Sequence, residues 1–117
     1  MNRYLIFAGA LLFASTALAQ EAPESARRDL WCGLAFEYAA GEITSDAPER
    51  QQAVIPRYAD GASMLIARAA AAYGRAGLNE AGFATRRAAV EAEIARQLAG
   101  SEPAAFSFED CSELLEQ

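Results

Sequence analysis

The two cysteines are the strongest constraint that this sequence places on its fold. Cys32 and Cys111 are the only cysteines of the 117-residue chain. In a chain-entropy model, a bond that closes their loop of about 80 residues stabilises the folded state by about 4.5 kcal/mol. The spacing is not that of a C-x-x-C redox pair, and two cysteines without any histidine cannot complete a zinc shell unless carboxylates join them. We therefore predict a structural disulfide that joins the two ends of one small domain.

The first nineteen residues have the pattern of an export signal. Arg3 gives a positive start, an apolar run extends from Tyr4 to Phe13, and Ala17-Leu18-Ala19 is an A-x-A cleavage site. The apolar run is short for a hydrocarbon layer of ~30 Å, so an uncleaved anchor helix is the less favoured alternative. We predict a cleaved secretory signal peptide at residues 1–19 and a single small helical domain at residues 20–117. The mature protein is then periplasmic or secreted, without a stable membrane span, in a compartment where disulfides persist.

The composition excludes several kinds of chemistry. The chain has no His, and all ten of its basic residues are Arg. Histidine triads, histidine zinc sites, Schiff bases and the P-loop lysine are therefore excluded. The formal net charge of -6 argues against nucleic acid, whose binding depends on cations. We predict no catalytic residue, no metal site and no cofactor. The alternative that stays open is a small enzyme with a carboxylate base.

The apolar spacing predicts an all-α fold: a small bundle of three main helices plus a short C-terminal helix. The main helices are expected at residues 22–40, 56–76 and 80–99, and the short helix ends near residue 115. Glycines are expected to end the main helices, at Gly41, Gly77 and Gly100. N-terminal caps are expected at Asn79 and Ser107, and also at Asp46 for a short helical stretch after Pro48.

Each main helix has a predicted apolar face. In the first helix the face contains Leu30, Trp31, Leu34, Ala35 and Tyr38. In the second it contains Tyr58, Ala62, Leu65, Ile66, Ala69, Ala72, Tyr73 and Ala76. In the third it contains Phe83, Val90, Ile94 and Leu98, and the polar side offers the surface pairs Arg87–Glu91 and Glu93–Arg96. The small side chains of residues 69–72 allow close approach by a neighbouring helix or by a second copy, so a homodimer stays open.

Four aromatic residues are candidates for either core or ligand-facing positions: Trp31, Tyr38, Tyr58 and Tyr73. We favour a core position for Trp31, packed over the disulfide, with Gly33 allowing close approach of a helix. We favour the edge of the core for the tyrosines, and the alternative is that they line a pocket between helices. The pairs Arg27-Arg28 and Arg86-Arg87 are expected to be solvated, and the alternative is that they hold an anionic ligand.

The general plan resembles two groups of small exported helical proteins with one disulfide: the acid-stress periplasmic chaperones and the helical immunity proteins of the periplasm. The resemblance lies in size, export and the single bridge, and the absence of Lys departs from the chaperones. We expect a non-catalytic binding or interaction protein, such as an inhibitor or immunity-type module. An acid-stress chaperone is the alternative. The expected partner is another envelope protein or a basic molecule, because the chain is acidic.

Overall fold

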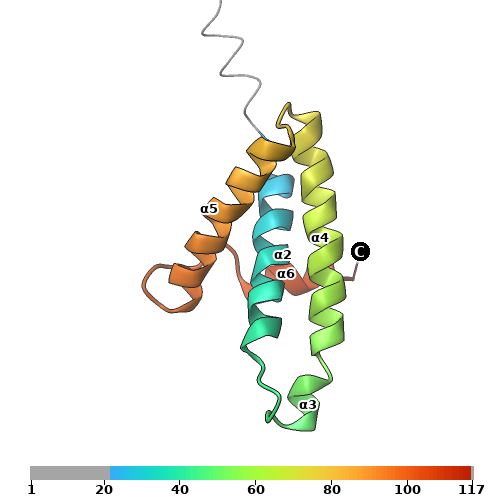
Figure 1. Cartoon of the computed structure of the whole chain (residues 1–117), viewed down its shortest axis with the longest axis vertical. Coiled ribbons are helices and arrows are strands. Elements are labelled where there is room, and N and C mark those ends of the chain that lie inside the picture. The colour runs from blue at the N-terminus through green and yellow to red at the C-terminus, as the bar shows by residue number, and fades with distance from the viewer. Residues whose placement is uncertain (1–21, 117) are drawn as a thin grey trace, which may run out of the picture.

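The computed structural model describes residues 22–116, which form an all-helical fold (Figure 1). The helices are α2 (Glu24–Glu42), α3 (Glu49–Gln52), α4 (Ile55–Arg75), α5 (Glu80–Leu98) and α6 (Phe108–Leu114). The predicted bundle of three main helices and a short C-terminal helix is confirmed, and α3 is the short helical stretch expected after Pro48. No helix among the described residues is long and apolar enough to cross a membrane. The predicted signal peptide, residues 1–19, lies outside the described residues.

Helix α2 is the centre of the fold. In Figure 1 it lies between α4 and α5, and it packs most extensively against α4, then against α5 and α6. Eight consecutive residues, Asp29–Phe36, are buried, so α2 is covered on several sides and not on one predicted face alone. The core around α2 also includes Leu65, Ala69 and Ile94 from the neighbouring main helices. A helix that is surrounded by other elements has no solvated face to alternate with an apolar one.

A glycine sets the close approach of α2 and α4, as the sequence indicated. A Cβ built on Gly33 would lie 2.8 Å from Cγ1 of Ile66 and 3.2 Å from the backbone oxygen of Ala62. The second contact is with backbone, which cannot move aside without shifting a whole helix. Ala62 and Ala69 are both buried, so small side chains line the same contact on α4.

We predict that Gly33→Ala lowers the free energy of unfolding by about 1–3 kcal/mol, because the added methyl group overpacks the α2–α4 contact. Gly74→Ala is the matched control, since a Cβ on Gly74 of α4 has nothing within 4 Å. Alanine favours a helix over glycine, so the control should gain up to about 1 kcal/mol. Urea denaturation of both variants measures the difference, and equal effects at the two positions would contradict this packing.

The disulfide attaches α6 to the central helix. Cys32 and Cys111 are bonded with Cα atoms 5.2 Å apart, which confirms the predicted bridge. The hydroxyl oxygen of Ser107 accepts a hydrogen bond from the backbone N–H of Asp110 at 3.0 Å, so the predicted N-cap of α6 is also confirmed. Leu114 is buried beside the bridge, and Leu115 packs so closely on Gly61 that a Cβ there would overlap it.

Two predicted helix ends are wrong, and three others are confirmed. Helix α2 continues through Gly41 to Glu42, because Gly41 keeps helical geometry and the N–H of Ile43 bonds to the oxygen of Ala40 instead. Asp46 does not cap α3, which begins after Pro48; a side-chain hydrogen bond with Thr44 holds the pKa of Asp46 below its usual value. The predicted ends at Gly77 and Gly100 are confirmed, since these glycines have positive φ angles of 105° and 88°. The predicted N-cap of α5 at Asn79 is also confirmed.

Candidate functional site

Helix α5 is the loosely packed member of the bundle. It leaves the end of α4 through a short turn and diverges from it, so that its main contact is with α2 (Figure 1). Only Ile94 and Gln97 are buried on α5, while Phe83 and Val90 are half-buried. The predicted inward position of Leu98 is wrong, since this side chain is 43% exposed. Gln97 takes the inward place because it follows Phe83 and Val90 at seven-residue intervals, which keeps it on the side that faces α2.

Gln97 connects α5 to Trp31 through a buried hydrogen-bond network. The indole Nε1–H of Trp31 donates to Oε1 of Gln97 at 2.8 Å, and the backbone N–H of Ala105 donates to the same oxygen at 3.2 Å. The amide nitrogen of Gln97 donates to Oε1 of Glu93 at 2.8 Å. The ring of Phe106 meets the ring of Trp31 edge to face at 5.8 Å. Together these contacts fix the indole between α5 and the 105–106 segment.

We predict that Gln97→Leu lowers the free energy of unfolding by about 1–3 kcal/mol, because it leaves the buried N–H of Trp31 without an acceptor. Tryptophan fluorescence during urea unfolding measures the effect, and the native emission of Trp31 should shift as well. Leu98→Gln makes the reverse exchange at an exposed neighbour and should stay within about 0.5 kcal/mol of the wild type. A Gln97→Leu variant as stable as the wild type would show that the network contributes little.

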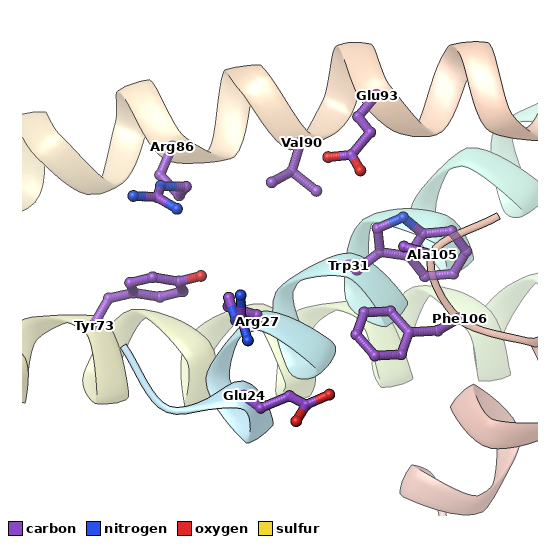
Figure 2. A pocket seen from close by; sticks show the side chains of 9 residues that line it. All are labelled: Glu24, Arg27, Trp31, Tyr73, Arg86, Val90, Glu93, Ala105 and Phe106. Atoms are coloured by element: carbon purple, nitrogen blue, oxygen red, sulfur yellow. The ribbon is translucent and has the colours of Figure 1, made fainter. Parts of the chain in front are cut away.

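A hollow of about 370 Å³, here called the central groove, opens beside Trp31 (Figure 2). It lies between α2, α4, α5 and the 105–106 segment. Its lining residues are Glu24, Arg27, Trp31, Tyr73, Arg86, Val90, Glu93, Ala105 and Phe106. Trp31, Val90 and Phe106 supply its apolar surface. The volume is within the range of ~300–1,000 Å³ that small-molecule sites usually occupy.

Charged side chains of both signs line the central groove. Figure 2 shows Arg27, Arg86 and Tyr73 together at one end, with the Tyr73 hydroxyl directed toward Arg27. The guanidinium carbon of Arg86 lies 5.7 Å from the centre of the Tyr73 ring, a cation–π contact. Glu93 lies at the other end, above Trp31 and Ala105. A ligand in the groove would therefore meet Arg27 and Arg86 at one end, with the carboxylate of Glu24 near Arg27, and the rings of Trp31 and Phe106 together with Glu93 at the other end.

The phenol of Tyr73 is protonated near neutral pH, as an ordinary tyrosine is. Burial raises the pKa of Tyr73 further, although the charges of Arg86 and Arg27 act in the opposite direction. The hydroxyl therefore stays a hydrogen-bond donor at the cationic end of the groove.

The structure separates the four aromatic candidates of the sequence. Trp31 and Tyr73 are both buried and both line the central groove. Tyr58 instead stacks on Phe36 with ring centres 5.4 Å apart, and the exposed Phe108 meets both rings edge to face. Tyr38 is half-buried beside a shallower hollow on the other side of α5. Only two of the four candidates thus come together.

The structure agrees with the predicted positions of the charged residues only in part. Of the two predicted surface pairs, Arg87 meets Glu91 at 3.0 Å, while Arg96 pairs with Glu102 at 2.9 Å and not with Glu93. Arg87 also reaches Glu37 of α2 at 3.2 Å. Within residues 22–116, Arg27 and Arg86 take part in no ion pair.

A partly buried ion pair, whose acidic member lies two residues before Trp31 in the chain, was not predicted from the sequence. Asp29 of α2 accepts two hydrogen bonds from Arg68 of α4, at 2.7 and 2.8 Å. The contact raises the pKa of Arg68. The sequence did contain an indication of this pair. Arg68 lies three residues after Leu65 and next to Ala69, at the border between the apolar and polar faces of α4. The buried position of Gln97 was also not predicted, although Gln97 follows Val90 by seven residues and so lies on the same face of the helix.

No group of three or more His, Cys, Asp or Glu side chains within residues 22–116 is arranged to hold a metal ion. The fold and the central groove define the class of structure: a small all-α domain with one disulfide and an open hollow between its helices. No protein-family model, curated protein or solved structure matches this chain. The function therefore has to be argued from the groove and the residues that line it.

Proposed function

We propose that this protein is an exported, non-catalytic binding protein whose recognition site is the central groove. The observation that carries the proposal is the convergence of aromatic and charged side chains from four segments of a small domain on one hollow. Binding sites are usually concave and mainly apolar, with a few polar groups that fix orientation. The groove is concave, with Trp31 and Phe106 as apolar walls and Tyr73, Arg27 and Arg86 at one end. It is more polar than most such sites, because four of its nine lining residues are charged.

Two features support binding without catalysis. The chain has neither His nor Lys, and both of its thiols form the disulfide. A catalytic base in the groove would have to be one of two carboxylates, Glu24 or Glu93, and Glu93 is already an acceptor for the amide of Gln97 at 2.8 Å. A small enzyme is therefore the less favoured alternative. Export is supported by the signal pattern at residues 1–19 and is compatible with the disulfide.

The test starts from protein isolated from the periplasm and analysed by native mass spectrometry. Loss of residues 1–19 and of two hydrogens would establish cleavage and oxidation together. The expected result is a retained species, either a small molecule or an envelope protein with a basic surface. Val90→Glu, which places a charge in the groove, should lose that species. Ala88→Glu makes the same change on the exposed side of α5 and should retain it. A wild-type protein that carries nothing, or two variants that behave alike, would contradict the proposal.

A second candidate, an acid-stress chaperone, is favoured by the carboxylates that join the helices. Asp29 pairs with Arg68 across α2 and α4, and Glu37 pairs with Arg87 across α2 and α5. Protonation of these carboxylates in acid would remove both pairs and leave the arginine charges to repel one another, which would expose apolar surface. ANS fluorescence and near-UV circular dichroism at about pH 7 and about pH 2 test this. Unchanged spectra would exclude it.

A further inference from the structure

We infer that the central groove binds a small apolar molecule that ends in a carboxylate, with the carboxylate held by Arg27, Arg86 and the Tyr73 hydroxyl. The inference rests on the proposed binding function and adds the chemical class of the ligand. It depends on three observations: the cationic groups without ion-pair partners among the described residues, the position of the phenol, and the apolar side chains that line the groove beyond them.

The cationic groups are available to a ligand. Among the described residues, no carboxylate forms an ion pair with Arg27 or Arg86, whereas Arg68, Arg87 and Arg96 all have such partners. Arg86 is instead held over the face of Tyr73 at 5.7 Å, which limits its movement and keeps its N–H groups near the phenol. A guanidinium presents several donors in a planar fork that fits the two oxygens of a carboxylate.

The phenol completes the donor set. Figure 2 shows the Tyr73 hydroxyl directed into the space that Arg27 and Arg86 share. The ring itself is buried, so the hydroxyl has a fixed position. The phenol is protonated near neutral pH, and burial raises the pKa of Tyr73 further, so the hydroxyl can donate a hydrogen bond. Two guanidinium groups and one neutral donor around the same point favour an anionic group.

The other residues that line the groove indicate what the remainder of the ligand should be. Val90, Trp31 and Phe106 offer apolar contact beyond the cationic end. Glu93 and Glu24 also line the groove, and a second anionic group placed near them would be repelled. This arrangement disfavours dianions and polyanions. It favours a short apolar chain or ring with one carboxylate.

Trp31 is the only tryptophan of the chain and lines the groove, so its fluorescence reports directly on occupancy. Three probes share one six-carbon body and differ in the end group: hexanoate, hexanol and hexylammonium. Each is titrated to about 10 mM into the full oxidised protein, with calorimetry as the second measurement. Hexanoate should bind at least about tenfold more tightly than hexanol, and hexylammonium more weakly than either. Added salt should weaken hexanoate binding but not hexanol binding.

Three variants locate the anion site. Arg86→Gln and Tyr73→Phe should each weaken hexanoate binding by about fivefold to tenfold and leave hexanol binding unchanged. Arg75→Gln removes the same charge from the exposed end of α4, outside the groove, and should bind hexanoate like the wild type. Tyr73→Phe keeps the buried ring, so circular dichroism should show an unchanged fold.

Several outcomes would overturn the inference. They are equal binding of hexanoate and hexanol, unchanged hexanoate binding in Arg86→Gln and Tyr73→Phe, an equal loss in Arg75→Gln, and no binding of any probe. The proposed function fails separately, through the native mass spectrum of the periplasmic protein. A species that is lost from Val90→Glu while hexanoate does not bind would keep the groove as a binding site and exclude this ligand class.

Discussion

The double variant Cys32→Ala/Cys111→Ala is expected to lose about 4.5 kcal/mol of unfolding free energy, because the bridge closes a loop of about 80 residues. Domains of this kind have a total stability of ~5–15 kcal/mol, so the variant should be partly unfolded at physiological temperature. Both cysteines are fully buried between α2 and α6, and alanine avoids placing an unpartnered hydroxyl there. Urea denaturation followed by circular dichroism measures the loss.

Hydrogen exchange would show which helix of the double variant loses protection first. Helix α6 has only seven residues and is held by the bridge, Leu114 and Leu115. Its amides should lose protection before those of α4, because a short helix is marginal without its tertiary contacts. Ser112→Ala changes a half-buried neighbour of the bridge and serves as the control. A loss below about 1 kcal/mol in the double variant would mean that the helices are held together without the bridge.

The second large effect is expected at the Asp29–Arg68 pair. Arg68→Met should lower the free energy of unfolding by about 2–3 kcal/mol, because it leaves a carboxylate without its partner in a buried position. The side chain of Asp29 is 8% exposed, while that of Arg68 is 40% exposed. The partial exposure of Arg68 lets water approach the carboxylate, so the effect should fall below the ~3–5 kcal/mol of fully buried pairs.

The two partners should behave unequally. Asp29→Asn should cost only about 1 kcal/mol, because a neutral amide can still accept a hydrogen bond and the exposed guanidinium keeps its hydration. In the double variant, Asp29→Asn/Arg68→Met, no charge is left buried, so the loss should be smaller than in Arg68→Met alone. Arg75→Met removes an exposed arginine from the same helix and should change stability by less than about 0.5 kcal/mol. Equal losses for Arg68→Met and Asp29→Asn would contradict this asymmetry.

The sequence by itself determined the helices, most of their ends and the disulfide. These depend on neighbours in the chain: Gly77 and Gly100 adopt the positive φ that glycine tolerates, and Asn79 and Ser107 accept from backbone N–H groups three residues on. The bridge follows from a count of two cysteines. The predicted helix ends at Gly41 and Asp46 were wrong for a local reason. Glycine can also lie inside a helix, and aspartate can also lie in a loop without capping a helix.

Only the tertiary structure decided what the helices enclose. Helix α5 turns Gln97 inward and Leu98 outward, and this places Trp31, Tyr73, Arg27 and Arg86 around one groove. These residues are far apart in the chain, and periodicity fixes only the face of each helix. The rotation and crossing of α2 and α4 depend on the close contact at Gly33 and the Asp29–Arg68 pair. Helix α5 is placed by the Trp31–Gln97 hydrogen bond and the Arg87–Glu37 pair. A site made by several helices is determined by how they pack, because packing alone brings distant side chains to the same point.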